Sequence, residues 1–289
     1  MKTFGILALS LLVTTAYSQD FVRKSDVVYM KQDGAAFTMD VFRPAKQNGI
    51  AVIFMVSGGW VSNHNSINTE LAKQCTDRGF TVFQVVHGAQ PRYKVPEIVK
   101  QVQRAVRFVR SHASEYGVNA NKLAITGGSA GGHLSLMIAS LASPGNPGGP
   151  DPVERESALV NSVGVFYPPT DFTNYGKAGF FAFDNPLLMA TYGRAFLDDP
   201  KTAPKEKMVE VGKSMSPLAF MTASMPPTFL VHGDADLLVP IQQSEITIKK
   251  LKELGVKCEL VTVPGKGHGW AGIEVQVGQI LDWFEKTLK

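Results

Sequence analysis

The segment KLAITGGSAGGH, residues 122–133, constrains the fold more than any other stretch of this chain. An apolar run ends in Gly-Gly-Ser-Ala-Gly and a helical pattern follows at once, which predicts Ser129 on a tight turn at the carboxyl end of a strand. The backbone of such a turn runs close to its neighbours, so a Cβ atom at Gly127 or Gly131 would clash. The following helix points free N–H groups at the serine, which suits an oxyanion. Taken alone, the segment also fits an ordinary glycine-rich turn that contains a serine.

Two later stretches carry the groups that would activate a serine. A serine hydroxyl needs a base to take its proton and a third group to hold that base in the right tautomer. HGDADLLVP, residues 232–240, offers the carboxylates Asp234 and Asp236, and PGKGHGW, residues 264–270, offers His268 between glycines. Each stretch follows a predicted strand, and the chain order is serine, acid, base. This joint order favours a nucleophilic Ser129 over the ordinary turn.

Strands and helices alternate along most of the chain. Continuous apolar runs are typical of strands buried on both faces of a parallel sheet, and a turn at 32–34 predicts an antiparallel pair at the edge. The predicted strands cover 25–30, 37–42, 50–56, 80–86, 122–126, 163–167, 228–231 and 258–263. One predicted helix ends at residue 79, a second begins at residue 96, and a third follows the turn that carries Ser129. Two more predicted helices cover about 241–254 and 273–287. This alternation predicts an α/β fold with a mostly parallel central sheet, helices on both faces, and active groups at the carboxyl ends of the strands.

Two stretches interrupt this alternation. SPGNPGGPDP, residues 143–152, is rich in Gly and Pro and is predicted to be a surface loop. Residues 168–226 are too long for a simple connection and are predicted to form a cap over the site. The aromatic residues in and beside this stretch are Phe166, Tyr167, Phe172, Tyr175, Phe180, Phe181, Phe183, Tyr192 and Phe196. We interpret them either as walls for an acyl group, an aromatic group or a sugar ring, or as the cap's own core.

Composition and charge exclude some classes of protein. With 289 residues, 44% hydrophobic and 19% charged, the chain has the balance of a globular domain and not of a disordered or fibrous protein. Its net charge of +4 is spread along the sequence without a block of Lys and Arg. We therefore expect no nucleic-acid partner.

The first residues read as a targeting segment. Residues 1–18 combine a positive start at Lys2, an apolar stretch over 4–13 that is too short to span a bilayer, and a small-x-small cleavage site before Gln19. We therefore expect a signal peptide and a secreted or periplasmic protein, with no later membrane anchor. Export makes a disulfide possible, but Cys75 and Cys258 fall in an early helix and a late strand, so two unpaired thiols are expected and a bridge is the alternative.

The residues around these candidates resemble a known family. GGSAGGHL, HGDADLLVP and GKGHGW, together with the opening DVVYMKQDGAAFTMDVFRPA, are similar to the acetyl-esterase and feruloyl-esterase-like branch of the α/β-hydrolase superfamily, which is related to prolyl oligopeptidases. The resemblance covers nearly the whole chain after residue 18. It implies an α/β-hydrolase domain over 19–289 with a cap-like insertion at about 168–226. It also implies Ser129 as the nucleophile, Asp236 as the orienting acid and His268 as the base.

The resemblance also implies different roles for Asp234 and Asp236. The family's acid follows an H-G-x-x-D spacing, which runs here from His232 to Asp236. Asp234 is then interpreted as a turn former that bonds its own backbone. A helix N-cap remains the alternative for Asp236.

Attack on a carbonyl also needs donors for the developing oxyanion. One is expected to be the backbone N–H of Ala130, the residue after the nucleophile. The second is expected from the SGGW loop, residues 57–60, where Gly59 and Trp60 are both candidates. The alternative is that the glycine pair only eases a tight turn. Related esterases usually carry a histidine at the start of this loop, and here Ser57 takes that place, so whether Ser57 braces the loop stays open.

The other five histidines are given lesser roles. His133 and His232 are expected to be buried and structural, and His112 to be a solvated helix residue. His64 and His87 are expected in loops on the active face, where they could touch substrate. No pair has a metal-binding spacing, so neither a metal nor another cofactor is expected.

These observations predict a secreted serine carboxylesterase. Its substrates would be short acyl or aryl esters, with acetyl or feruloyl groups on plant polysaccharide as the suggestion of the family resemblance, and it would work through an acyl-enzyme. A serine peptidase of the prolyl-oligopeptidase type is the alternative among enzymes. A non-catalytic binding protein on a hydrolase scaffold is the alternative outside them, although a fold alone would not require all three of Ser129, Asp236 and His268.

Overall fold

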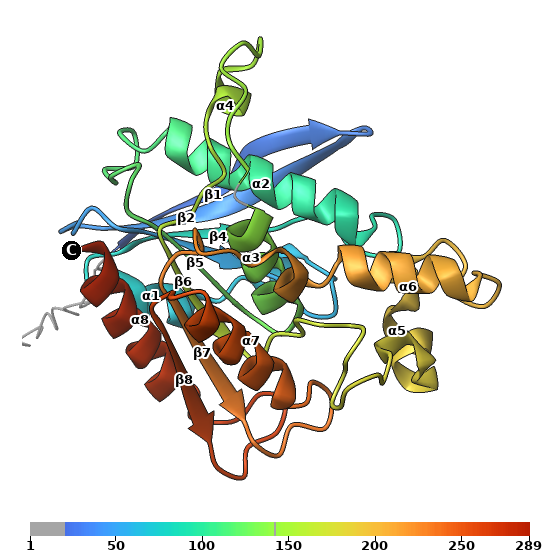
Figure 1. The fold of residues 1–289 in the computed structure, drawn as a ribbon. Helices are drawn as coiled ribbons and strands as arrows, with labels where there is room; N and C mark the ends of the chain where they lie inside the picture. The colour runs from blue at the N-terminus through green and yellow to red at the C-terminus, as the bar shows by residue number, and fades with distance from the viewer. Residues whose placement is uncertain (1–20, 142) are drawn as a thin grey trace, which may run out of the picture.

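The central element is one eight-stranded sheet. The computed structural model describes residues 21–141 and 143–289. The strand order is β1-β2-β4-β3-β5-β6-β7-β8 (Figure 1). The strands are β1 (Phe21–Gln32), β2 (Ala35–Pro44), β3 (Ala51–Met55), β4 (Thr81–Val85), β5 (Leu123–Gly128), β6 (Ser162–Phe166), β7 (Thr228–Gly233) and β8 (Cys258–Val263). β2 pairs antiparallel with β1 and with β4, and all the other pairs are parallel. The expected α/β-hydrolase fold is confirmed.

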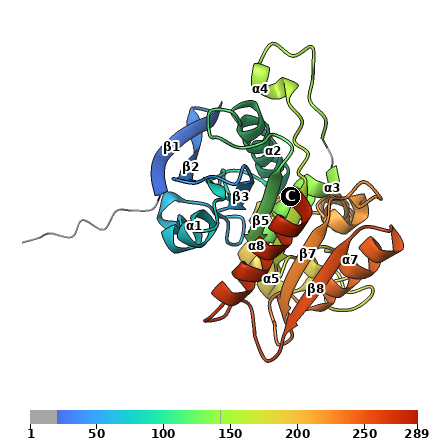
Figure 2. The same ribbon diagram turned by 90° about the vertical axis from the view of Figure 1, so that its left-hand side faces the viewer.

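Helices cover both faces of this sheet (Figures 1 and 2). The helices are α1 (Thr69–Thr76), α2 (Val95–Ser111), α3 (Ala130–Leu141), α4 (Pro152–Arg155), α5 (Pro186–Phe196), α6 (Lys205–Ser214), α7 (Gln242–Glu253) and α8 (Glu274–Leu288). One buried apolar cluster joins α1 and α8 to one face of the sheet, and a second joins α2, α3 and α7 to the other face. This separation follows from parallel strands, whose two faces both need cover.

The sequence patterns explain the individual helices. The predicted apolar stripe of α2, with Ile98, Val102 and Val109, is fully buried against the sheet. α3 is apolar nearly all round, and its residues from Ala130 to Ser140 are buried on every side. A helix with that composition needs a fully enclosed place, so α3 fixes the turn that precedes it inside the molecule.

Some predicted boundaries need correction. The edge pair is longer than expected, since β1 and β2 run over 21–32 and 35–44, and the strand before Ser129 continues to Gly128. α2 begins at Val95, one residue before the expected start. Cys75 and Cys258 are both free, and they pack into clusters on opposite faces of the sheet, which explains why they are not bridged.

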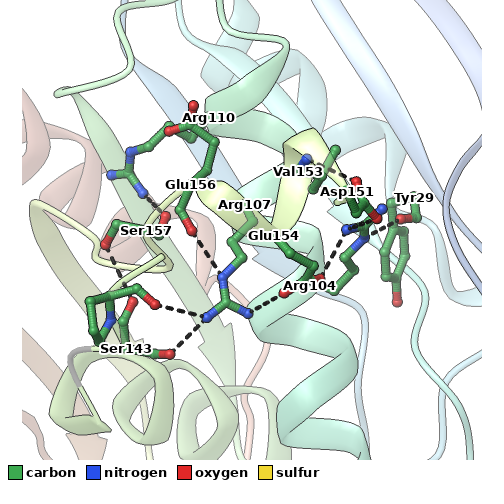
Figure 3. Close-up of polar contacts among 11 residues, drawn as sticks. Tyr29, Arg104, Arg107, Arg110, Ser143, Asp151, Val153, Glu154, Glu156 and Ser157 are labelled. Atoms are coloured by element: carbon green, nitrogen blue, oxygen red, sulfur yellow. Dashed lines mark hydrogen bonds and ion pairs between the residues drawn. The ribbon is translucent and has the colours of Figure 1, made fainter. Parts of the chain in front are cut away.

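The Gly/Pro-rich stretch forms a projecting loop that ends in α4 (Figure 1). Three arginines, three residues apart on α2, hold this loop, as Figure 3 shows. Arg104 Nη1 lies 2.9 Å and Arg107 Nη1 3.1 Å from the two carboxylate oxygens of Glu154, and Arg110 donates to the carbonyl of Ser157. Most residues of the loop 143–152 are exposed, as predicted. Its two ends are tied to α2, because Arg107 donates to the Pro144 oxygen and Arg104 pairs with Asp151.

Residues between β6 and β7 form a helical segment at the side of the sheet (Figure 1). It contains α5, α6 and two short 3-10 turns, η2 (Ala182–Asp184) and η3 (Pro217–Phe220). Its rings pack on Trp60, with centroid distances of 4.8 Å from Phe196, 5.8 Å from Tyr192 and 6.2 Å from Phe172. We call this segment, residues 168–226, the cap.

The expected signal peptide, residues 1–18, lies outside the described residues. Within residues 21–141 and 143–289, none of the helices has both the length and the apolar character needed to cross a membrane.

Candidate active site

Ser129 lies on the sharp turn between β5 and α3. Its φ is +53°, in the left-handed region that residues other than glycine rarely adopt. A Cβ on Gly127 would lie 2.6 Å from the carbonyl carbon of Gly131, and one on Gly131 would lie 2.9 Å from the Met55 oxygen. The glycine requirement predicted from the sequence is thus confirmed. The strained turn projects the serine at the carboxyl end of β5.

His268 connects Ser129 to Asp236. Its Nε2 lies 2.9 Å from Ser129 Oγ, and its Nδ1 lies 2.8 Å from Asp236 Oδ2. A carboxylate only accepts hydrogen bonds, so Nδ1 carries the ring proton and the Nε2 lone pair faces the serine hydroxyl. In this arrangement a neutral histidine can take the serine's proton. The structure therefore brings together the three residues that the sequence predicted.

The loop after β7 holds one oxygen of the Asp236 carboxylate. Its Oδ1 accepts the N–H groups of Leu238 and Val239, both at 2.9 Å. Burial alone would raise the pKa of Asp236, but hydrogen bonds from His232, His268 and the Val239 N–H outweigh burial and hold its pKa well below the ordinary value. Asp236 is therefore charged at every pH at which His268 would act as a base.

His232 and Asp234 support this loop in different ways. The His232 ring is buried, with Nδ1 2.7 Å from Ser244 Oγ and Nε2 2.8 Å from the Val239 oxygen, which confirms a structural role. The turn-forming role expected for Asp234 is wrong. Its Oδ1 accepts the N–H of Gly265 at 2.6 Å and does not bond its own backbone. Asp234 thus ties the loop that carries the acid to the loop that carries the base.

Three N–H groups are candidates for the oxyanion site. Those of Gly59, Trp60 and Ala130 donate to no other residue within the described part of the chain. Gly59 and Trp60 have φ values of +56° and +59°. Gly59 borders both hollows beside Ser129, whereas Trp60 borders one of them, so Gly59 is favoured as the partner of Ala130.

The loop that carries Gly59 is braced by Gln90, a residue that no motif in the sequence marks. Gln90 Nε2 donates to the Gly59 oxygen at 3.0 Å, and its backbone N–H donates to the Trp60 oxygen at 3.1 Å. The hydroxyl of Ser57 is buried without a partner among the described residues, so no contact there shows it bracing the loop. Only the position of Gln90 in the sequence hints at this role, because Gln90 follows β4, which neighbours β3 in the sheet.

Ser129 lies between two hollows of very different size. One is a narrow pocket with about 30 Å³ of free volume, and the other is an open cleft with about 550 Å³. The cap aromatics that line the narrow pocket are Phe172, Tyr175, Phe183, Tyr192 and Phe196. All but Tyr192 are also buried members of the main core, so the same rings line the pocket beside Ser129 and form part of the core. Phe180 and Phe181 border neither hollow.

Tyr167 and His268 line the open cleft. Tyr167 follows β6 with a φ of +36°, an unusual value for a bulky residue, and its ring centroid lies 4.6 Å from that of His268. Burial raises the pKa of the Tyr167 hydroxyl, and the charge of Asp236 raises it further. Tyr167 is thus a neutral aromatic wall next to the candidate base.

The remaining histidines border neither hollow beside Ser129. His133 is buried in α3, where its Nδ1 lies 3.2 Å from Trp60 Nε1, which confirms the structural interpretation. His87 is 2% exposed and borders neither hollow, so the expectation that it could touch substrate is wrong. His64 Nε2 lies 2.7 Å from Thr38 Oγ1 on β2 and 3.2 Å from Asp26 Oδ1 on β1, and His64 borders neither hollow. His112 is half-buried at the end of α2. No group of three or more His, Cys, Asp or Glu side chains that could hold a metal is found in residues 21–141 and 143–289.

Comparisons with known proteins agree with this geometry. The family model named BD-FAE matches residues 39–251. "Probable carboxylic ester hydrolase LipM" of Mycobacterium tuberculosis is 30% identical over 241 residues, which cover 82% of this chain and 53% of that protein. The chain spans about half the length of the curated relatives that it matches first, at 53%, 60% and 46%.

Two solved structures share the fold. A truncated carbohydrate esterase from gut microbiota has a TM-score of 0.79 at 24% identity, with 93% of this chain and 98% of the other covered. The acetyl ester-xyloside bifunctional hydrolase of Caldicellulosiruptor lactoaceticus has a TM-score of 0.73 at 23% identity, with 91% and 96% covered. These likenesses extend over nearly the full length of both chains.

Proposed function

We propose that this chain, which belongs to the BD-FAE family of α/β-hydrolases, is a serine carboxylesterase that removes short acyl groups through an acyl-enzyme. The observation that carries the proposal is the continuous line from Asp236 through His268 to Ser129, with links of 2.8 and 2.9 Å. The names of the relatives, carboxylic ester hydrolase and carbohydrate esterase, support the same reaction class.

In the first half of the proposed reaction, Ser129 Oγ attacks the ester carbonyl while His268 Nε2 takes its proton. The carbonyl oxygen becomes an oxyanion held by the N–H groups of Ala130 and Gly59, where one such donor is worth about 3–4 kcal/mol. His268 then gives its proton to the leaving alcohol oxygen. In the second half a water molecule attacks the acyl-serine, with His268 again taking and returning a proton.

The position of His268 supports a proposal for which hollow takes each part of the ester. The leaving oxygen must come within hydrogen-bond reach of His268 Nε2, because that atom supplies its proton. His268 borders the open cleft and does not border the narrow pocket. The alcohol part therefore lies in the open cleft, and the acyl part enters the narrow pocket under the cap.

The size of the narrow pocket selects the acyl group. Its free volume of about 30 Å³ is a few times the ~10–15 Å³ that a single water position needs. An acetyl group fits such a space, whereas the aromatic ring of a feruloyl group does not. We therefore favour acetyl over feruloyl esters. Two solved neighbours are named as a carbohydrate esterase and an acetyl ester-xyloside hydrolase, and this supports a sugar as the alcohol.

The proposal includes export, which rests on the sequence of residues 1–18 alone. Expression in a secreting host should yield a mature protein whose amino-terminal residue is Gln19. Retention of Met1 in the folded protein would remove the export proposal.

The test of the activity is hydrolysis of nitrophenyl esters by the purified protein. We expect turnover of the acetate, a fall in kcat/KM of about ten-fold or more per added pair of methylenes, and no turnover by Ser129→Ala. Thermal unfolding of Ser129→Ala at the wild-type temperature is the control for its fold. A wild-type protein without turnover of any ester would favour the non-catalytic alternative.

A further inference from the structure

The open cleft continues beyond Tyr167 into a second hollow. This hollow has about 420 Å³ of free volume and shares Phe54, Gly128 and Tyr167 with the cleft. It runs between α1 and the first turn of α8, two helices that lie on the same side of the sheet (Figure 2). We call this second hollow the α1–α8 groove. It begins where the alcohol part of the substrate would leave the reacting atoms.

The walls of the groove are fixed in the folded protein. Arg78, just after α1, donates through Nε to Glu285 at 3.0 Å, through Nη1 to the Gly278 oxygen at 3.1 Å, and through Nη2 to Asp282 at 2.5 Å. All three partners lie on α8, so one side chain holds α1 and α8 together. A preformed groove binds a ligand without first ordering its own walls.

The groove joins an apolar floor to a polar rim. Phe54, Phe166 and Tyr167 supply ring surfaces along its floor. The rim carries Glu70 and Gln74 from α1 and Glu274 from α8. Among the described residues, no hydrogen bond or ion pair joins these three side chains to another group, so their oxygens and the Gln74 amide are available to a ligand.

We propose that the α1–α8 groove binds further sugar units of a neutral oligosaccharide whose acetylated unit lies at Ser129. Sugar rings have apolar faces that stack on aromatic side chains, and hydroxyl groups that donate to carboxylates and amides. Two carboxylates on the rim disfavour an acidic sugar, because like charges repel. The ligand class is therefore a neutral polyol chain and not a uronic acid polymer. This inference rests on the proposed esterase activity.

The experiment compares substrates of different length on matched variants. The substrates are nitrophenyl acetate, an acetylated methyl xyloside, and acetylated xylotetraose. The groove variant combines Glu70→Ala, Gln74→Ala and Glu274→Ala. The control is Glu245→Ala, which removes an exposed carboxylate from the first turn of α7 on the other face of the sheet.

We expect wild-type kcat/KM for acetylated xylotetraose to exceed that for the methyl xyloside by about ten-fold or more. The groove variant should lose this advantage, mainly through KM, and keep its rate on nitrophenyl acetate. Glu245→Ala should behave as wild type. Acetylated oligogalacturonate should react no faster than the methyl xyloside.

Binding gives a readout that is independent of catalysis. Ser129→Ala protein should bind unacetylated xylotetraose in calorimetry, and the three groove substitutions should weaken that binding about ten-fold or more. Equal rates of the groove variant and wild type on xylotetraose acetate would overturn the inference while leaving the esterase intact. Absence of turnover on nitrophenyl acetate in the wild type would instead overturn the proposed function.

Discussion

Protonation of His133 should make the folded protein sensitive to mild acid. The ring lies in the core, with Nε2 2.8 Å from the Met215 oxygen and Nδ1 3.2 Å from Trp60 Nε1. An indole N–H only donates, so Nδ1 must accept and the ring must be neutral. Protonation would set a second N–H against that of Trp60, and burial lowers the pKa of His133 from 6.5 to about 4.

The size of the effect follows from these two pKa values. In the unfolded chain His133 titrates near 6.5, so between pH 6.5 and pH 4 the unfolded chain binds one proton more than the folded chain. The stabilisation by neutral His133 is complete above pH 6.5 and is lost as the pH falls toward 4. The gap between the two values corresponds to about 3 kcal/mol of unfolding free energy, or about 1.4 kcal/mol per pH unit.

The assay is urea unfolding followed by tryptophan fluorescence between pH 7 and pH 4.5. His133→Gln keeps one donor and one acceptor but cannot titrate, so its unfolding free energy should fall less steeply with pH than that of the wild type. Burial also lowers the pKa of His87 to about 4. His87→Gln should therefore remove a second, separate part of the pH dependence of the unfolding free energy. A wild-type pH slope in His133→Gln would refute this account.

Three substitutions near the site test its geometry. Asp236→Asn removes the acceptor that fixes the Nδ1 proton, so kcat should fall about 10⁴-fold on nitrophenyl acetate with the fold retained; a loss below ten-fold would contradict the assigned tautomer. Gln90→Ala removes the hydrogen bond to the Gly59 oxygen and should lower kcat about ten-fold; a rise in KM alone would assign Gln90 to binding instead. Phe196→Ala opens the pocket under the cap, and the ratio of butyrate to acetate kcat/KM should rise; an unchanged ratio would exclude this pocket as the acyl site.

The residues of the candidate triad could be predicted because each follows a strand of the same parallel sheet. The carboxyl ends of β5, β7 and β8 meet at one edge, so loops far apart in sequence bring Ser129, Asp236 and His268 within hydrogen-bond distance. The order of motifs along the chain was therefore enough to name these residues.

Other parts of the site leave no such trace in the sequence. Gln90 and Asp234 act on backbone atoms of other loops, and no pattern in the sequence marks a backbone carbonyl or N–H as a partner. The sequence shows that the cap is rich in aromatic residues, but which of them line the pocket depends on how the cap packs on Trp60. Both kinds of information arise only from tertiary packing.

Three of the five described non-glycine residues with positive φ lie at this same edge of the sheet. Trp60, Ser129 and Tyr167 have positive φ values and follow β3, β5 and β6, which are neighbours in the sheet. Each such residue costs about 1–3 kcal/mol and persists only where its surroundings hold it. Here the Ser129 N–H donates to the Phe166 oxygen at 3.0 Å, and the Tyr167 N–H donates to the Val231 oxygen at 2.8 Å. The backbone is thus held by hydrogen bonds at Ser129 and Tyr167, next to the candidate donors, the nucleophile and one wall of the cleft.

The two specificities of this site come from different parts of the chain. The acyl pocket is walled by the cap, through residues such as Phe196, whereas the α1–α8 groove is built from helices on the other face of the sheet. Phe196 and Glu70 share no contact, and substitutions without shared partners usually have additive free energies. Combining Phe196→Ala with Glu70→Ala should therefore multiply their separate effects on acyl preference and on chain-length preference. The measurement uses acetylated and butyrylated xylotetraose. A marked departure from the product of the two single effects would mean that the cap and the groove are energetically coupled through the sheet. The acyl and alcohol sites would then not select their groups independently.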